Sequence, residues 1–244
     1  MNIKLILFII FIFSSCAKEN ILLEEDLSLE FERAMKYYNK GKYARAKDKF
    51  DNIILFNPGS KLANDAQYYM AESMFQLEEY SESSSAFDRY VRFASASSLV
   101  NMEKSRYRMC QCAINLSNSF QRDQTQTQSA ITQLQIFIED FPDSDFLLDA
   151  EEAIRLLRVK LARKDYESGR LYLKREEYDS ALIYFQSVLN EYYDTEVADD
   201  ARIGIMFTHI LNKNYPGALS YFNSQNGRFL SEAKYLQAND LIQE

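Results

Sequence analysis

The chain has 244 residues, 47% of them hydrophobic, so it is long and apolar enough to bury a sizeable core. Only six glycines and three prolines occur, which argues against long disordered segments. Lysine and arginine total 28 against 36 aspartates and glutamates, a formal charge of -8, and this acidic balance argues against nucleic acid as the main partner because phosphate binding needs a basic surface.

The N-terminus has the features of an export signal. Lys4 precedes an unbroken apolar run, Leu5–Phe13, which is too short to cross a bilayer as a helix because that takes about 20 residues. The small pair Ser14-Ser15 leads directly to Cys16, which resembles the lipobox of bacterial lipoproteins, although Phe13 stands where leucine is usual. The resemblance implies a signal peptide over residues 1–15, a diacylglycerol thioether on Cys16 and an acyl chain on its new amino group.

A lipidated Cys16 would hold the chain on a membrane surface. Each buried methylene contributes about 0.8 kcal/mol, and three acyl chains exceed the two lipid signals that stable anchoring needs. Residues 16–26 are then a lipidated tether, and residues 27–244 are the folded part. Two alternatives stay open, an ordinary cleaved signal followed by a free thiol and an uncleaved anchor.

The first folded segment, Phe31 to Ser60, contains two helix-length apolar patterns joined at Gly41. Its second half places four residues at steps of three, four and four: Tyr43, Ala46, Phe50 and Ile54. This spacing puts them on one helix face, which must be buried. Gly41 supplies the backbone angles of a tight turn between helices, and Ser60 is a plausible N-cap for the next helix.

The same stripe returns four times along the chain. The copies are Tyr80, Ser83, Phe87 and Val91; Thr127, Ala130, Leu134 and Ile138; Tyr178, Ala181, Phe185 and Leu189; and Tyr215, Ala218 and Phe222. Their leading residues are 37, 47, 51 and 37 apart, close to the roughly 34-residue period of tetratricopeptide arrays. Such helix pairs cannot bury their apolar faces alone and stack into a solenoid whose groove is the usual binding surface. The sequence therefore predicts an all-α solenoid of about five tetratricopeptide-type hairpins.

The irregular steps have local explanations. A loop over 115–126 accounts for the 47-residue step, and the serine-rich residues 94–98 are expected to form another loop. No helix breaker occurs from Asp145 to Gly169, so one long helix of about 30 residues is predicted near 145–175. Pro216 fits the first turn of its helix, and residues 231–243 are expected to form a capping helix with Ala233, Leu236 and Leu241 inward.

No constellation of residues predicts catalysis, a cofactor or a metal. Cys110 and Cys112, two apart on a helix, point about 200° away from each other and are expected to be buried thiols. His209 is expected to be a core or half-buried residue, since no second histidine completes a site. The acidic pairs are interpreted as solvated helix surfaces rather than acid–base pairs: Glu24-Glu25, Glu78-Glu79, Glu151-Glu152 and Asp199-Asp200.

Seventeen tyrosines are the more informative excess. Tyr38, Tyr68 and Tyr69 fall on first helices near the predicted groove, where a tyrosine can stack on a peptide and hydrogen-bond it. The alternative for these three is packing within the repeat. Tyrosines at repeat positions are expected in the core: Tyr37, Tyr43, Tyr80, Tyr172, Tyr178 and Tyr215.

Several segments together resemble the BamD family, the tetratricopeptide lipoproteins of the outer membrane barrel-assembly complex. They are Gly41-x-Tyr43-x-x-Ala46-x-x-x-Phe50 ending in Pro58-Gly59-Ser60, Asp123-Gln124-Thr125 leading to Phe137-Ile138 and Phe141-Pro142-Asp143-Ser144, and the run from Arg155 to Tyr166 followed by Tyr172. The resemblance covers nearly all of the chain after the signal. It departs at Ser95, where the family usually has proline.

The resemblance implies a non-catalytic scaffold, lipid-anchored at the periplasmic face of the outer membrane. In the family, the first two repeats (residues 27–97 here) receive the C-terminal aromatic segment of unfolded barrel proteins. The later repeats (98–244) dock on the periplasmic domains of the barrel-forming subunit. An alternative is a periplasmic tetratricopeptide adaptor in cell-wall coordination or glycan uptake, although the absence of tryptophan disfavours sugar stacking. A third reading, a periplasmic enzyme dependent on His209, has the least support.

Overall fold

The computed structural model describes residues 26–93 and 99–243, and these residues form helices joined by turns and loops. They belong to two compact units, unit 1 ending at Leu116 and unit 2 beginning at Ser117. The predicted signal peptide, Cys16, most of the tether and the loop at 94–98 with Ser95 lie outside the described residues. Within the described ranges, no helix has the length and hydropathy needed to span a bilayer.

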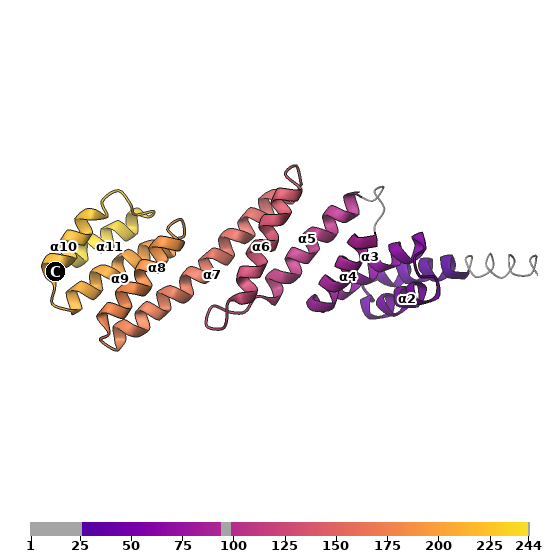
Figure 1. Ribbon diagram of the computed structural model, residues 1–244, viewed down its shortest axis with the longest axis horizontal. Coiled ribbons are helices and arrows are strands. Elements are labelled where there is room, and N and C mark those ends of the chain that lie inside the picture. The colour runs from indigo at the N-terminus through magenta and orange to yellow at the C-terminus, as the bar shows by residue number, and fades with distance from the viewer. Residues whose placement is uncertain (1–25, 94–98, 244) are drawn as a thin grey trace, which may run out of the picture. The chain divides into compact units, whose positions relative to one another are not determined.

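Unit 1 is a run of antiparallel hairpins (Figure 1). A helix over residues 26–38 is followed by α2 (Tyr43–Phe56), α3 (Lys61–Gln76), α4 (Tyr80–Phe93) and α5 (Leu99–Leu116). Each of α2, α3 and α4 packs against the helix that follows it. The core between them contains Leu27, Ala34, Ala46, Phe50, Ile53, Ala66, Met70, Ala71, Ala86 and Phe87.

Unit 2 contains α6 (Thr125–Asp140), α7 (Leu147–Lys174), α8 (Tyr178–Glu191), α9 (Val197–Leu211), α10 (Tyr215–Ser224) and α11 (Glu232–Gln243). The helix predicted near 145–175 is confirmed, since α7 has 28 residues and is about 42 Å long at 1.5 Å per residue. Figure 1 shows α6 along its first part and α8 and α9 along its last part. The loop predicted over 115–126 is shorter, at 117–124, and Lys160 and Lys164 tie it to α7 by bonds to Ser117 Oγ (2.7 Å) and the Arg122 carbonyl (2.8 Å).

The repeated stripes are buried, with one shift at their ends. Ala46, Phe50, Ala181 and Phe185 are fully buried, as are their equivalents in the other copies except Phe222, which is half-buried. The last fully buried position is one residue earlier than predicted: Ile53, Tyr90, Phe137 and Val188, not Ile54, Val91, Ile138 and Leu189, which are half-buried. At about 100° per residue, a residue seven positions after the small residue lies about 20° from it, whereas the eighth lies about 80° away.

The tyrosines that lead the stripes do not lie in the core. Tyr43, Tyr80 and Tyr178 are half-buried and Tyr215 is 63% exposed, so the prediction that they are core residues was wrong, most clearly for Tyr215. Each is the first residue of its helix, beside the turn rather than between two helices. A residue in that place can be covered on one side only.

The hairpin turns share one unusual backbone angle. Gly41 has φ of 69°, as predicted, and residues at the same place in other turns also have positive φ: Glu78 (62°), Glu176 (61°) and Lys213 (56°). Each stands two residues before a stripe-leading tyrosine. The fold therefore requires a left-handed residue at this place whether or not glycine occupies it.

Helix starts follow the predicted capping chemistry. The Ser60 side chain accepts a hydrogen bond from the Ala63 N–H at 3.0 Å, which confirms Ser60 as an N-cap. Pro216 lies in the first turn of α10, as predicted, where its missing N–H costs nothing.

The inward face of α11 differs from the prediction. Ala238 is fully buried, whereas Ala233 is exposed, Leu236 is 51% exposed and Leu241 is half-buried. Tyr235 packs on the rings of Phe222 and Phe229, with centroids 5.6 and 5.8 Å away. These aromatic contacts and the small Ala238 determine which face turns inward.

Candidate functional site

The three tyrosines predicted to line a groove lie together in unit 1. Tyr38 ends the first described helix, and Tyr68 and Tyr69 lie on α3. The ring of Tyr69 contacts the rings of Tyr38 and Tyr68, with centroids 5.5 and 5.3 Å away. All three residues are half-buried. The structure thus brings together residues that are about 30 positions apart in the sequence.

Packing fixes these rings in place. Tyr69 stacks on Phe50 with centroids 5.8 Å apart, and Tyr68 contacts Tyr90 at 5.3 Å. Packing within the repeat, the alternative left open for these tyrosines, therefore holds for their rings. Within the described residues their hydroxyl groups have no hydrogen-bond partner, and none of the three hydroxyl oxygens is completely shielded from solvent. A rigid ring that presents an unpaired hydroxyl can bind a polar ligand with little loss of side-chain entropy.

A partly buried ion pair adjoins the tyrosines. Glu72 on α3 is only 4% exposed, and Arg108 on α5 donates a hydrogen bond from Nε to its Oε1 at 2.9 Å. The Arg108 guanidinium also lies 4.6 Å from the centre of the Phe75 ring. We call Tyr38, Tyr68, Tyr69, Glu72 and Arg108 the tyrosine surface. Its members come from the first described helix, α3 and α5.

The charge of Glu72 affects the neighbouring phenols. Burial, with the Glu72 carboxylate as the next cause, raises the pKa of Tyr38 to about 12. The same two causes raise the pKa of Tyr68 further. Both phenols therefore remain neutral hydrogen-bond donors at neutral pH. Sequence reasoning missed Glu72 and Arg108; the signal was an acidic residue one turn after Tyr68, amid the buried positions of α3.

Unit 2 contains a pocket of about 580 Å³ lined by residues of α7, α8, α9 and α11. Its lining residues are Tyr166, Arg170, Leu173, Lys174, Phe185, Ile203, Gly204, Phe207, Leu211, Gln237, Asp240 and Leu241. Phe207 and Leu211 are 40% and 42% exposed, so apolar surface remains open to solvent here. We call this site the unit 2 pocket. None of its lining residues was predicted as a contact site.

Two glycines pack against Phe185, a residue that lines the unit 2 pocket. A Cβ placed on Gly169 or Gly204 would lie 2.7 or 2.8 Å from the Phe185 ring. Only glycine allows both helices to approach this fully buried ring so closely. Two mid-helix glycines, unfavourable for helix propensity, are therefore explained by packing.

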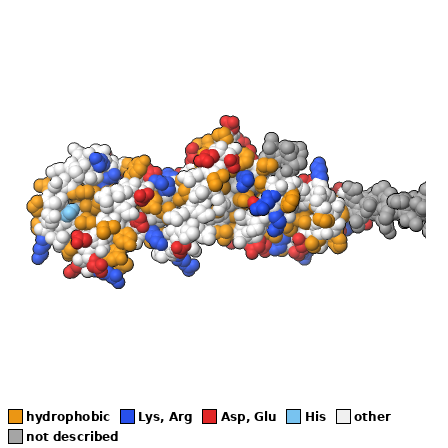
Figure 2. All heavy atoms as spheres, in the orientation of Figure 1, with side chains coloured by type: hydrophobic (Ala, Val, Ile, Leu, Met, Phe, Trp, Pro, Cys, Tyr) orange, Lys and Arg blue, Asp and Glu red, His pale blue; other side chains and the backbone are white. Residues whose placement is uncertain are grey.

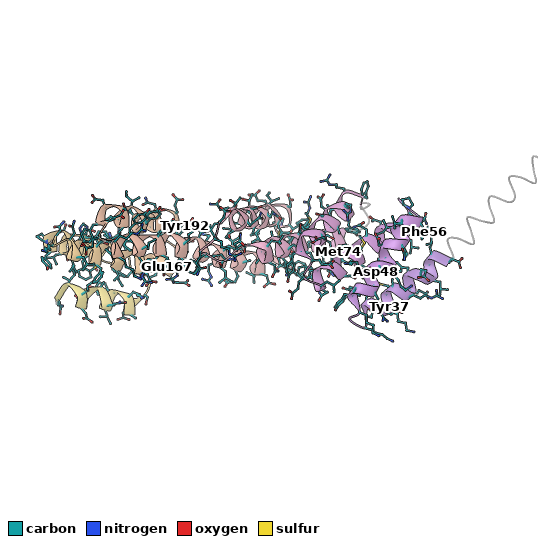
Figure 3. The ribbon with its side chains drawn as sticks, turned by 90° about the horizontal axis from the view of Figure 1, so that it is seen from below. Tyr37, Asp48, Phe56, Met74, Glu167 and Tyr192 are labelled. Atoms are coloured by element: carbon teal, nitrogen blue, oxygen red, sulfur yellow. The ribbon has the colours of Figure 1, made fainter. Side chains whose placement is uncertain are left out.

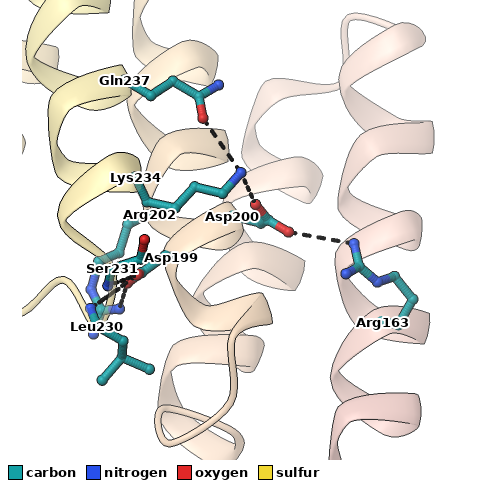
Figure 4. A network of polar contacts seen from close by, with 8 residues as sticks. All are labelled: Arg163, Asp199, Asp200, Arg202, Leu230, Ser231, Lys234 and Gln237. Atoms are coloured by element: carbon teal, nitrogen blue, oxygen red, sulfur yellow. Dashed lines mark hydrogen bonds and ion pairs between the residues drawn. The ribbon is translucent and has the colours of Figure 1, made fainter.

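Asp199 is not the solvated surface residue that the acidic pair Asp199-Asp200 suggested. Its carboxylate is 1% exposed and accepts hydrogen bonds from the backbone N–H groups of Leu230 (2.9 Å) and Ser231 (2.8 Å) and from Arg202 (2.8 Å) (Figure 4). Asp200 faces the other way and pairs with Lys234 at 2.8 Å and Arg163 at 3.4 Å. The two acids hold the start of α11 against α9 and link it to α7.

The cysteines and the histidine considered as catalytic or metal-binding residues do not form a common site in the described part of the chain. Cys110 and Cys112 are buried, reduced thiols, as predicted, and burial raises the pKa of both, that of Cys110 to about 12. His209 is half-buried, 6.5 Å from Tyr221 between ring centres, as expected. No group of three metal-ligating side chains converges in residues 26–93 and 99–243.

The comparison with known families matches residues 24–230 to YfiO, an outer membrane lipoprotein family. This chain belongs to that family. The match covers both structural units, from before the first described helix to the loop ahead of α11. The protein is accordingly an outer membrane lipoprotein of the YfiO family.

Its curated relatives carry one name. Outer membrane protein assembly factor BamD of Rickettsia prowazekii is 24% identical over 207 residues, which cover 82% of this chain and 81% of that protein. BamD of Caulobacter vibrioides is 22% identical over 231 residues, covering 92% and 75%. The BamD resemblance seen in the sequence is thereby confirmed.

Solved tetratricopeptide structures align along most of the YfiO-family chain. The TPR2AB domain of yeast Sti1, described as a complex with pHSP90, is 14% identical with a TM-score of 0.45, covering 90% of this chain and 96% of that one. YrrB, described as a TPR protein with an unusual peptide-binding site, is 17% identical with a TM-score of 0.36, covering 93% and 97%.

Proposed function

We propose that this protein is the non-catalytic scaffold lipoprotein of an outer membrane β-barrel assembly complex. The observation that carries the proposal is the family match over residues 24–230, together with relatives named as outer membrane protein assembly factors. In this proposal Cys16 carries the lipid anchor, and the folded units bind other polypeptides in the periplasm.

The tyrosine surface is the proposed site for unfolded barrel proteins. It offers ring faces for apolar and aromatic side chains and neutral hydroxyl donors for backbone carbonyls. These features suit a C-terminal aromatic segment in an extended conformation. The surface falls within residues 27–116, so the proposed substrate side includes Arg108 of α5, beyond the boundary at residue 97 that the sequence suggested.

The unit 2 pocket is the proposed docking site for the barrel-forming subunit. Its exposed Phe207 and Leu211 supply apolar contact area, and Arg170, Lys174 and Asp240 supply a polar rim. An apolar centre with a charged rim is the usual anatomy of a protein–protein interface.

The test is a pull-down of the tagged full-length protein from detergent-solubilised envelopes. We expect to recover the barrel-forming subunit with its periplasmic domains. Recovery of peptidoglycan enzymes without any outer membrane barrel protein would contradict the proposal and favour the adaptor alternative. Labelling with palmitate tests the anchor separately: the natural chain should incorporate label, and Cys16→Ala should not.

A further inference from the structure

The first hairpin of unit 1 carries a cluster of basic side chains that the proposed function does not use. A cavity of about 440 Å³ is lined by Arg33, Lys36, Tyr37, Lys40, Lys42, Arg45 and Lys49. These residues come from the first described helix, the turn after it and α2. We call this set the basic patch. Tyr37 lies at the lower edge of unit 1 in Figure 3.

Most of this positive charge has no counter-ion. Glu30 pairs with Arg33 and Lys49, and these two cations lower the pKa of its carboxyl, Lys49 more than Arg33. Within the described residues, Lys36, Lys40, Lys42 and Arg45 form no ion pair, and all four are exposed. Arg45 lies over the Tyr37 ring, 5.9 Å from its centre. A concentrated positive field is unusual on a chain with a formal charge of -8.

The patch lies on the first folded element after the proposed anchor. Nine residues lie between Cys16 and the first described helix, so the ten steps from Cys16 to Asp26 span at most about 35 Å at 3.3–3.6 Å per residue. The tether itself has one cation, Lys18, against Glu19, Glu24, Glu25 and Asp26. Attraction to an anionic surface near the anchor must therefore come from the folded hairpin.

We propose that the basic patch docks unit 1 onto the anionic headgroups of the membrane that holds the lipid anchor. The proposal rests on the lipidation of Cys16 in the proposed function. Basic residues beside a lipid anchor are attracted to anionic leaflets, and the attraction fades within a Debye length of about 10 Å at 0.1 M salt. Docking would fix which face of unit 1 is turned to the membrane.

Energy transfer to labelled lipid can measure this docking in the lipidated full-length protein. The donor dye is attached to Asn39→Cys, an exposed turn residue next to Lys40 of the patch, since burial protects Cys110 and Cys112 from labelling. The acceptor is a headgroup-labelled lipid, in vesicles of phosphatidylcholine alone or with about 30% phosphatidylglycerol. On the anionic vesicles we expect roughly twofold higher transfer, lost when salt is raised about tenfold.

A charge-matched control separates the patch from net charge. Lys36→Gln, Lys40→Gln, Lys42→Gln and Arg45→Gln together should reduce transfer to the phosphatidylcholine level. Lys104→Gln, Arg122→Gln, Arg175→Gln and Arg228→Gln remove the same charge from exposed positions elsewhere and should leave transfer unchanged. Equal transfer on both vesicles, or equal loss in both variants, would overturn the proposal.

The remaining outcomes are also decisive. A polyglutamate peptide that binds the patch, while vesicle composition has no effect on transfer, would identify an acidic polypeptide as the partner and overturn lipid docking. A chain that does not stay on the vesicles at all would show that Cys16 is not an anchor, which removes the basis of this inference. A chain that stays on the vesicles without lipid dependence would refute the docking and leave the assembly function intact.

Discussion

Among single residues, Asp199 has the largest expected effect on the C-terminal end of the chain. Arg202 is only 7% exposed and is paired with the buried Asp199 carboxylate. Asp199→Asn would remove that negative charge and leave Arg202 unpaired. Because an unpaired buried charge is costly, we expect a loss of about 3 kcal/mol in the free energy of unfolding of unit 2. Urea denaturation followed by circular dichroism measures it.

The neighbouring acid provides the control. Asp200→Asn breaks only partly exposed ion pairs, with Lys234 and Arg163, and should cost about 1 kcal/mol or less. Equal losses of unfolding free energy in the two variants would show that the burial of Asp199 does not increase its contribution to stability.

The raised pKa of Tyr38 predicts a pH dependence. Its phenol titrates at about 12 in the folded chain against an ordinary value of 10.0, so folding favours the neutral form. The stabilisation is complete below pH 10 and is lost as pH rises towards 12. Subtracting the ultraviolet phenolate titration of Tyr38→Phe from that of the natural chain isolates this one group.

We expect the difference in phenolate absorbance to rise near pH 12 in the folded protein, in buffer. In urea, where the chain is unfolded, the same rise should occur near pH 10. A step near 10 in the folded protein would mean that Tyr38 is fully solvated and that the tyrosine surface is not packed as described.

Between secondary-structure elements, some hairpin turns have backbone strain at a non-glycine residue with positive φ, and a glycine substitution can relieve it. Glu176 has φ of 61°, and its side chain forms no hydrogen bond in the described residues. The side chain therefore does not offset the energetic cost of the left-handed backbone. Glu176→Gly should raise the free energy of unfolding of unit 2 by about 0.5–1 kcal/mol, because the relieved strain exceeds the added chain entropy.

The adjacent Glu177→Gly is the matched control for that turn. Its φ is -87°, where glycine relieves nothing and adds chain entropy, so we expect no gain or a loss of about 0.5–1 kcal/mol. Thermal unfolding of both variants compares them, and a stabilised Glu177→Gly would contradict the explanation by strain.

What the sequence could predict follows from the range of the interactions. The burial of Ala46 and Phe50, the cap at Ser60 and the left-handed Gly41 depend on neighbours within two helical turns, and all were predicted. The Glu72–Arg108 pair and the Asp199–Leu230 bond join residues more than 30 positions apart. No local pattern shows which distant group will meet a carboxylate, so Asp199 was taken for a solvated residue.

For α11 the failure has the same origin. Leucines at 236 and 241 gave a plausible inward stripe, but aromatic contacts of Tyr235 with residues from α10 and the loop after it decide the orientation. Similarly, the three tyrosines were predicted as a set from their helix positions, whereas the charged half of the tyrosine surface was not.

Over the whole molecule, binding function depends on where hydrophobic surface is exposed to solvent. Exposed hydrophobic side chains are scattered among charged ones over the face seen in Figure 2. Scattered single residues of this kind are normal on a soluble surface and need no partner. The tyrosine surface and the unit 2 pocket differ because several features converge at each, and they lie in separate units.

This separation predicts a division of labour that substitutions can test. Tyr38→Phe with Tyr68→Phe keeps the packed rings and removes two unpaired hydroxyls. At about 0.5–1.5 kcal/mol for each lost hydrogen bond, binding of a C-terminal aromatic barrel peptide should weaken roughly 5- to 150-fold. Recovery of the barrel-forming subunit should be unchanged.

Phe207→Ala with Leu211→Ala should do the reverse, because it removes exposed apolar area from the unit 2 pocket alone. Leu148→Ala with Leu156→Ala is the control, since these side chains are 77% and 52% exposed on α7 and line none of the pockets named above. Fluorescence anisotropy of the peptide and pull-down of the subunit measure the two activities in each variant. If both test pairs lost both partners, the two sites would not act separately, which would contradict the division of labour.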